Sequence, residues 1–210
     1  MRGKMTQKLL VATHNKGKVS EFADMLADLD LAWLSLDDAG VTMDVAETGT
    51  TFRDNAILKA QAYAAETGLL TLADDSGLEV DALAGAPGVY TARYGGAGLT
   101  HAQRYALLLQ NLEGVPWEAR TARFRCVIAV AAPDGALQGE AAGVCEGIIA
   151  LAAAGDGGFG YDPVFFLPEW GQTMAQVGSV VKHQISHRGR AMRLLEPRLR
   201  QLLTAVNDAQ

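Results

Sequence analysis

A polar segment with two lysines has the chemistry to bind an anion. Thr13-His14-Asn15-Lys16-Gly17-Lys18 follows an apolar run and precedes a helical pattern. Backbone N–H groups at a helix start attract anions, and Lys16 and Lys18 add positive charge. Thr13 and Asn15 can also donate hydrogen bonds to phosphate oxygens. The segment is not a Walker A loop, because Val19 stands where that motif has Ser or Thr. It suits a phosphate loop and equally a solvated connection between strand and helix.

Two adjacent carboxylates have the chemistry to bind a metal ion. Asp74 and Asp75, followed by Ser76 and Gly77, come directly after the apolar run 69–73. We expect that run to be a buried strand that ends at the carboxylates, where α/β sheets bind ligands. Mg2+ prefers oxygen ligands and typically uses one or two carboxylates together with substrate phosphates. The alternative interpretation is an ordinary turn with an Asp side-chain cap.

Glu47 stands just before a predicted helix over 48–67 and could supply a further carboxylate to the metal. Taken alone, it suits an acid that stabilises a helix start. Asn55 and Lys59 are four residues apart and therefore share a helix face. Lys59 could point at phosphate, although a solvated lysine is the simpler interpretation.

A glycine-rich segment, Gly157-Gly158-Phe159-Gly160-Tyr161-Asp162-Pro163, suits close contact with a flat ligand. Glycines let the backbone approach a ligand, and Phe159 and Tyr161 offer faces on which a nucleobase stacks. Asp162 adds an acceptor. The alternative is a loop whose aromatic side chains pack in the core.

A second cationic segment runs from Lys182 through His187 and Arg188 to Arg190. Its donors suit the 6-oxo group of a purine, whereas adenine presents an amino donor there. The alternative is a helix start that Ser186 caps, with the basic residues in solvent. His183 and His187 have metal-ligand spacing, but no third ligand suggests itself.

The order of the apolar patterns predicts a mixed α/β domain that positions these segments. The expected strands are 9–12, 69–73, 121–131, 137–149 and 164–167, and the expected helices follow Lys18 and span 48–67, 99–112 and 190–206. Pro133-Asp134-Gly135 predicts a hairpin turn between two of the strands, so the sheet is not purely parallel. Gly85–Gly98 and Ala150–Gly160 are expected to be loops, and 154–160 to be a hinge or ligand loop.

Composition narrows the classes of function. With 210 residues, 49% hydrophobic content and a net charge of −6, the chain suits a globular domain and is a poor candidate for binding long nucleic acid. Cys126 and Cys145 form no C-x-x-C pair, and we expect two buried thiols. No apolar run approaches the ~18–20 residues of a membrane span. We therefore expect a cytoplasmic protein with one domain over 1–210, in which residues 1–5 are an N-terminal extension.

Taken together and in order, these segments resemble the inosine triphosphate pyrophosphatase family, which acts on non-canonical purine nucleotides. Each segment is weak evidence alone, but their order over nearly the whole chain is specific. The matching pieces are Thr13-x-Asn15-x-x-Lys18, Glu47-Thr48-Gly49-x-Thr51-Phe52-x-x-Asn55-Ala56-x-x-Lys59-Ala60, Ala73-Asp74-Asp75-Ser76-Gly77-Leu78, Gly85-Ala86-Pro87-Gly88-Val89-Tyr90-x-Ala92-Arg93, Gly157–Pro163 and Ser186-His187-Arg188-Gly189.

The resemblance implies a two-lobed α/β fold on a long mixed sheet, with the nucleotide cleft between the lobes, and a homodimer. It implies hydrolysis of dITP, ITP and XTP to the monophosphate and pyrophosphate with Mg2+ as cofactor. It also implies residue roles. Thr13–Lys18 would bind the triphosphate, Glu47, Asp75 and Asp74 the metal, and Ser76 the substrate. Asp75 would accept the proton, and Phe159, Gly160, Tyr161, Asp162, Lys182, His187 and Arg188 would enclose the base.

Two departures from the family pattern concern the site. His14 stands where many members carry Gly, and Ala46 where a further acid is often seen, so the metal would depend more on Glu47. Two rival functions also remain. One is a related pyrophosphatase that acts on modified pyrimidine nucleotides. The other is a non-catalytic nucleotide-binding module, which would not need Glu47 and Asp75 together.

Overall fold

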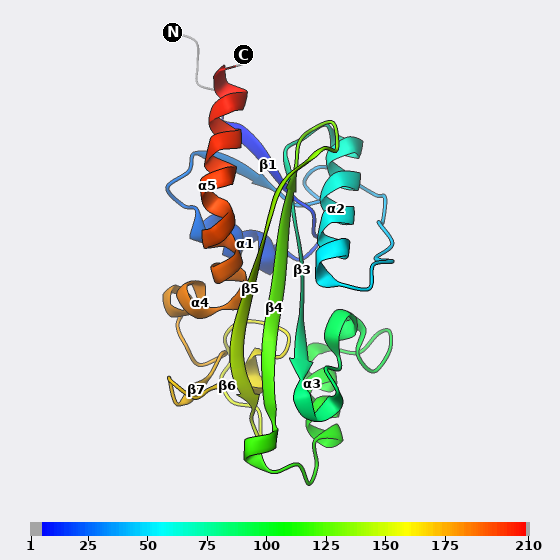
Figure 1. The fold of residues 1–210 in the computed structure, drawn as a ribbon, viewed down its shortest axis with the longest axis vertical. Helices are drawn as coiled ribbons and strands as arrows, with labels where there is room; N and C mark the ends of the chain where they lie inside the picture. The colour runs from blue at the N-terminus through cyan, green and yellow to red at the C-terminus, as the bar shows by residue number, and fades with distance from the viewer. Residues whose placement is uncertain (1–5, 209–210) are drawn as a thin grey trace. The chain divides into compact units, whose positions relative to one another are not determined.

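The computed structural model describes residues 6–208, with side chains up to Thr204. The predicted N-terminal extension, 1–5, lies outside the described residues. Within them a sheet of seven strands has the order β2-β1-β3-β4-β5-β6-β7. The strands are β1 (Gln7–Val11), β2 (Leu31–Leu34), β3 (Thr71–Val80), β4 (Thr121–Ala131), β5 (Leu137–Ile149), β6 (Phe165–Leu167) and β7 (Gln172–Thr173). The helices are α1 (Lys16–Met25), α2 (Phe52–Thr67), α3 (His101–Asn111), α4 (Ser179–Ile185) and α5 (His187–Asp208) (Figure 1).

The sheet is mixed, as the sequence predicts. β1 pairs in parallel with β2 and with β3, whereas β6 pairs antiparallel with β5 and with β7. The turn at Asp134-Gly135 joins β4 and β5 as a hairpin, and Ala132 N–H donates to the Ala136 carbonyl across it. The predicted bounds of β4 and β5 are confirmed, and buried residues alternate along the first half of β4 and the last half of β5.

The chain divides into two compact units. Unit 1 lies within Met1–Asp75, Val127–Ala142 and Ala191–Gln210, and unit 2 comprises Ser76–Cys126 and Gly143–Arg190. The long strands β3, β4 and β5 each contribute residues to both units.

In unit 1, α2 packs against one face of the sheet. Its buried residues Ala56, Ala60 and Ala64 join Leu10 of β1 and Ala12, which directly follows β1, in one apolar cluster. Small side chains on one helix face let α2 lie close to the strands. The helix begins at the Thr51 cap, whose hydroxyl oxygen accepts from Asp54 N–H, and ends at Gly68, which has a positive φ of 65°.

The opposite face of the unit 1 sheet is covered by α5. Strand alternation points Val130 away from Ala129 and Ala131, which belong to the α2 cluster. A Cβ added at Gly139 of β5 would contact Val130 of β4 and Leu195 of α5, so the face that carries Val130 lies against α5. Arg200 of α5 also pairs with Asp28, which follows α1.

Unit 2 has its own core beneath α3. Leu108 and Leu112 pack with Leu78 of β3 and Phe124 of β4, and the Phe124 ring lies 4.4 Å from that of Phe165. The predicted buried thiols are confirmed, because Cys126 and Cys145 are both free and buried. Burial is the main cause that raises the pKa of Cys145 to about 11.

Three predicted boundaries near the candidate site are wrong. α1 begins at Lys16 rather than after Lys18, because the Asn15 side chain caps it there. α2 begins at Phe52 rather than at 48, because Thr51 is its cap. β3 runs on to Val80 instead of ending before Asp74. The alternating residues Leu78 and Val80 are both buried in the unit 2 core and continue the strand pattern.

Other elements were missed by the sequence patterns. β2, β7 and α4 were not predicted, and all three are short. The segment Lys182–Arg190, expected ahead of the last helix, instead spans the end of α4 and the start of α5. Ser186 caps α5, as the alternative interpretation held, since its Oγ accepts from Gly189 N–H, but Lys182 and Arg188 are buried and not in solvent. Within residues 6–208, we find no helix with the length and apolarity that crossing a membrane requires.

Candidate functional site

The predicted phosphate segment forms an ordered turn at the start of α1. Asn15 Oδ1 accepts from the N–H groups of Gly17 and Lys18, at 2.9 and 3.4 Å. Thr13 Oγ1 accepts from Asn15 N–H at 3.1 Å. Accepting through oxygen leaves the donor groups of the Thr13 hydroxyl and the Asn15 amide unused by these bonds. The turn therefore offers side-chain donors and two lysines to an anion, although its first N–H groups are already capped.

His14 lies in this turn and pairs with a carboxylate that the sequence did not single out. Its Nδ1 lies 2.6 Å from Asp37 Oδ1, and both side chains are about half exposed. Asp37 belongs to a turn held by Ser35 and Asp38, and Leu36 N–H donates to the Thr13 carbonyl. The turn after β2 is therefore attached to the phosphate segment.

Lys18 reaches from α1 to the middle of β3. Its Nζ lies 2.9 Å from Asp74 Oδ1, and Asp74 is only 2% exposed. A buried carboxylate needs such a partner, since an isolated buried charge is strongly unfavourable. The contact explains why an acid is tolerated inside a buried strand, and it links the phosphate segment to the predicted metal ligands.

Lys59 lies at the centre of the acidic residues. Its Nζ is 2.6 Å from Glu47 Oε1, 2.9 Å from the Asp74 carbonyl oxygen and 3.6 Å from Asp75 Oδ1. Burial alone would lower the pKa of Lys59, but Asp75, Asp74 and Glu47 together raise it. The side chain is therefore a buried cation among oxygens, and the prediction of a solvated lysine is wrong.

Asp75 is held on both carboxylate oxygens. Its Oδ2 accepts from Asn55 Nδ2 at 3.1 Å, while Oδ1 faces Lys59. Burial is the largest cause that raises the pKa of Asp75 above its ordinary value of 3.8. Glu47 and Asp74 raise it further, and Lys59 and Asn55 oppose them. A carboxyl whose pKa is raised is a better proton acceptor near neutral pH.

The acid–lysine cluster, defined as Glu47, Asp74, Asp75, Lys18 and Lys59, lies within unit 1. Oxygen atoms of its acids already surround one cation, the Lys59 ammonium. Oxygen ligands are the kind that a hard metal ion such as Mg2+ prefers. Among the described residues no three His, Cys, Asp or Glu side chains form a metal site by themselves. A metal held here would therefore need ligands from outside the protein, such as phosphate oxygens.

A second cluster lies in unit 2 around Phe159. Asp162 Oδ2 accepts from Phe159 N–H and pairs with Lys182 Nζ, both at 2.9 Å. The Lys182 ammonium lies 4.8 Å from the Phe159 ring centroid, and the Arg188 guanidinium lies 5.5 Å from it. Arg188 Nη2 also donates to Ser76 Oγ at 3.0 Å. We call Ser76, Phe159, Asp162, Lys182 and Arg188 the aromatic–cation cluster.

Glycine at position 158 is required for this geometry. Gly158 has a φ of 72°, and a Cβ there would collide with Asp162 Oδ2. Both observations exclude a larger residue, because L side chains rarely adopt that φ. The glycine-rich segment thus lets Asp162 accept from the Phe159 backbone N–H, which fixes the position of Phe159 near the two cations.

Two predicted base-binding side chains are held in the core instead. The Tyr161 ring is 3% exposed in the unit 2 core, and its hydroxyl donates to the Thr91 carbonyl. Burial is the main cause that raises the pKa of Tyr161 to about 12. The expectation of a Tyr161 face for a base is therefore wrong. His187 is also buried, and it stacks on Phe124 with ring centroids 4.8 Å apart.

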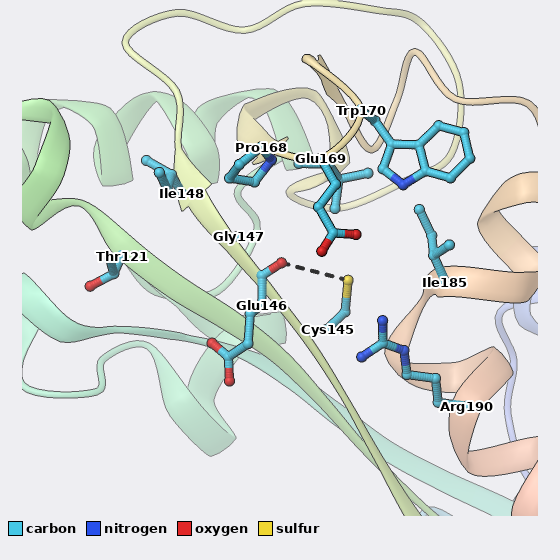
Figure 2. Close-up of a pocket in the computed structure, with 11 residues that line it drawn as sticks. Thr121, Cys145, Glu146, Gly147, Ile148, Pro168, Glu169, Trp170, Ile185 and Arg190 are labelled. Atoms are coloured by element: carbon cyan, nitrogen blue, oxygen red, sulfur yellow. Dashed lines mark hydrogen bonds between the residues drawn. The ribbon is translucent and has the colours of Figure 1, made fainter.

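A separate pocket of about 510 Å³ lies in unit 2, and of the predicted site segments it contains only Ile185 and Arg190, to which no role was assigned (Figure 2). Trp170 and Ile185 form part of its apolar wall, and Arg190 points toward it. Its lining includes no lysine and no glycine-rich turn, so it lacks the groups that a triphosphate requires. We therefore do not assign the nucleotide to this pocket.

The structure brings together residues whose roles the sequence did not reveal. For Asn55 the sequence indicated only that it shares a helix face with Lys59. Its hydrogen bond to Asp75 depends on the extension of β3 beyond the predicted end. Phe124 was correctly predicted to face the core from a strand, but nothing in the sequence indicated that its ring stacks on His187. The pairing of Asp37 with His14 had no local signal at all.

Comparisons with known proteins show which family the chain resembles. Residues 9–198 match the model of a family described as the Ham1 family. A dITP/XTP pyrophosphatase of Desulforamulus reducens is 53% identical to the chain, over 89% of this chain and 92% of the relative. The dITP/XTP pyrophosphatase of Geobacillus kaustophilus is 50% identical, over 90% and 93%.

Solved structures show the same similarity. The Staphylococcus aureus Ham1 protein matches with a TM-score of 0.81 and 39% identity, covering 93% of this chain and 99% of that one. A HAM1 protein from Coxiella burnetii matches with a TM-score of 0.83 and 40% identity, over 93% and 100%.

Proposed function

The chain belongs to the Ham1 family, and from that premise we propose that it hydrolyses non-canonical purine nucleoside triphosphates to the monophosphate and pyrophosphate. Its substrates are dITP, ITP, XTP and dXTP, and the protein is a hydrolase of the bond between the α- and β-phosphates. The observation that carries the proposal is the acid–lysine cluster, in which two lysines from different helices meet three carboxylates. A module that only binds nucleotide has no need for such costly buried charges.

The triphosphate binds at the start of α1. Lys16, Lys18 and the donors of Thr13 and Asn15 supply positive charge and hydrogen bonds. Lys18 is well placed to respond to phosphate, because the same ammonium holds Asp74 at 2.9 Å. Charge that develops on the phosphate oxygens during cleavage is stabilised by these fixed donors.

Asp75 accepts the proton of the attacking water. Its raised pKa makes it a stronger base than an ordinary aspartate, and Asn55 and Lys59 fix its orientation. Water so activated attacks the α-phosphorus, and pyrophosphate leaves on the opposite side. Lys59 offsets part of the negative charge of Glu47 and Asp75.

Mg2+ is proposed as the cofactor, with Glu47, Asp75 and Asp74 as its protein ligands. When bound, Mg2+ would neutralise charge on the phosphates and lower the pKa of the attacking water. Support comes from the donor set, which consists of oxygens alone. A direct check is isothermal titration of Mg2+ in the presence of a non-hydrolysable dITP analogue. Glu47→Gln should weaken that binding.

The aromatic–cation cluster recognises the base. Lys182 and Arg188 are donors that match the 6-oxo acceptor of hypoxanthine and xanthine, whereas the adenine amino group would leave them unpaired. Phe159 is half-buried beside the two cations and offers the flat face. Gly160 and the backbone beside Tyr161 complete the proposed enclosure.

The function is tested with a substrate panel. Purified protein with Mg2+ is given dITP, XTP, dATP, dUTP and a methylated dTTP, and the products are separated by ion-exchange chromatography. The proposal expects dIMP and XMP with equimolar pyrophosphate, and little turnover of the other three. Preferential cleavage of the pyrimidine nucleotides would establish the rival enzyme, and absence of pyrophosphate throughout would establish the binding module.

We also propose a cytoplasmic homodimer without nucleic-acid or membrane partners. The net charge of −6 supports the absence of nucleic acid, because phosphate backbones need a basic surface. The dimer rests on family resemblance. Light scattering after size exclusion should give twice the chain mass of 22.2 kDa, and a monomer mass would remove the dimer from the proposal.

A further inference from the structure

Asn55 makes two hydrogen bonds that join separate parts of the acid–lysine cluster. It lies in α2 and is 1% exposed. Its Nδ2 donates to Asp75 Oδ2 at 3.1 Å, and its Oδ1 accepts from Gly49 N–H at 2.8 Å. One amide therefore connects the proposed proton acceptor on β3 with the segment that carries Glu47.

These two bonds allow only one orientation of the amide. A carboxylate accepts and a backbone N–H donates, so the amide nitrogen must face Asp75 and the oxygen must face Gly49. In the reversed orientation the amide oxygen would face the Asp75 carboxylate, and the amide NH2 would face the Gly49 N–H. The side chain is thus fixed by its partners as well as by burial.

The neighbouring glycine is needed for this contact. A Cβ at Gly49 would lie 2.6 Å from Asn55 Oδ1 and 2.7 Å from Asp54 Cβ, both closer than real contacts allow. Gly49 lies two residues after Glu47, and Thr51, two residues further, caps α2. The 47–51 segment is therefore attached to α2 at three points: Gly49 bonds to Asn55, Thr51 caps the helix, and Glu47 pairs with Lys59.

We infer that Asn55 is a positioning residue that keeps Asp75 and the Glu47 segment in fixed register. The inference rests on the proposed function, since it concerns the proton acceptor of that reaction. Asn55 acts through Asp75 and Gly49 and is not itself a catalytic residue. Lys59, one helical turn along α2, holds Asp75 Oδ1 and Glu47, so the two side chains clamp the same pair of elements.

The test separates the two bonds with three variants. Asn55→Ala removes both bonds. Asn55→Asp keeps the shape and the acceptor for Gly49 but loses the donor to Asp75. Gly49→Ala keeps every polar group and displaces the amide. Gln61→Ala is the control, because it removes a hydrogen bond from the same helix, to the Gly135 carbonyl, far along the chain from Asp75.

Kinetics with dITP measure the effect on catalysis. Loss of a residue that orients a reactive group typically costs about 10–100-fold in activity. We expect that loss in kcat for all three variants, with KM changed less than threefold and Gln61→Ala within twofold of wild type. The double variant Gly49→Ala/Asn55→Ala should be no slower than Asn55→Ala, because both changes break the same link. A purely structural Asn55 would lower the unfolding temperature and leave kcat intact at lower temperature, and that would overturn the inference.

Hydrogen exchange at Gly49 gives a readout that does not depend on activity. The amide should exchange at least tenfold faster in Asn55→Ala and stay protected in Asn55→Asp. If Asn55→Ala does not fold, the same contrast is read from Gly49→Ala and Asn55→Asp. Unchanged exchange in Asn55→Ala would overturn the link to the loop. Wild-type protein that releases no pyrophosphate from dITP would defeat the proposed function alone, with the exchange pattern still expected.

Discussion

The acid–lysine cluster of unit 1 and the aromatic–cation cluster of unit 2 solve different electrostatic problems. The first gathers three carboxylates, and Lys59 and Lys18 compensate for their mutual repulsion. The second contains one carboxylate, Asp162, and uses it to hold Lys182 beside an aromatic ring that also faces Arg188. Carboxylates placed close together shift each other's pKa values, which suits proton transfer in a reaction. Hydrogen-bond donors placed around an aromatic ring suit recognition of a nucleobase. The comparison predicts that unit 1 changes affect turnover of every substrate and unit 2 changes affect the choice among them.

The largest expected effect is that of Asp75→Asn. The variant keeps the shape of the side chain but cannot accept the proton, and general-base catalysis contributes about 10²–10⁴-fold. We expect kcat for dITP and XTP to fall by about 10³-fold for both substrates alike, measured as pyrophosphate release. Turnover equal to wild type would remove Asp75 from the role of base.

Arg188→Ala should act on selectivity instead. Removing this donor reduces the advantage of a 6-oxo base over adenine by about tenfold, close to the value of one charged hydrogen bond. The measurement is the ratio of kcat/KM for dITP over dATP, with Arg193→Ala, a neighbour on α5, as the control. The same ratio before and after the change would exclude Arg188 from base recognition.

A smaller effect is expected from the cap of α2. Thr51→Ala removes the hydroxyl that accepts from Asp54 N–H, and such caps contribute about 1 kcal/mol to stability. Denaturant unfolding should show a loss of that size. Thr100→Ala, which removes the matching cap of α3 in unit 2, should cost a similar amount. A loss confined to Thr100→Ala would show that the start of α2 is held by other contacts.

The last prediction concerns the titration of Asp75 in metal-free protein. Burial and the neighbouring acids raise the pKa of this carboxyl above 3.8, and Lys59 lowers it. Lys59→Met should therefore move the pKa of Asp75 further upward, so that the carboxylate forms only at higher pH. A carbon-13 NMR titration of the carboxyl measures this, and a downward movement would contradict the assigned surroundings.

The scaffold could be predicted where a local signal marks the element. β4 and β5 alternate over part of their length and flank a Pro-Asp-Gly turn, and α2 ends at the glycine Gly68, so these predicted bounds agree with the structure. β3 was cut short because Asp74-Asp75-Ser76-Gly77 has the composition of a turn. Lys18 and Lys59, distant in sequence, compensate the two acids and let the strand continue.

The site residues could be named from the sequence, but not their partners. Lys59 was expected to be solvated, because no local pattern shows that Glu47 and Asp75 converge on it. Tyr161 and Phe159 are two residues apart and have similar chemistry, yet only the Tyr161 ring is buried in the core. That difference depends on packing against Leu78 and Phe124, which are far from it along the chain.

Isotope labelling tests the assigned cleavage most directly. Wild-type protein is incubated with dITP and Mg2+ in water enriched in oxygen-18, and both products are analysed by mass spectrometry. Attack of water at the α-phosphorus predicts one oxygen-18 atom in dIMP and none in pyrophosphate. Label in pyrophosphate, or release of inorganic phosphate with a nucleoside diphosphate, would contradict the assigned reaction.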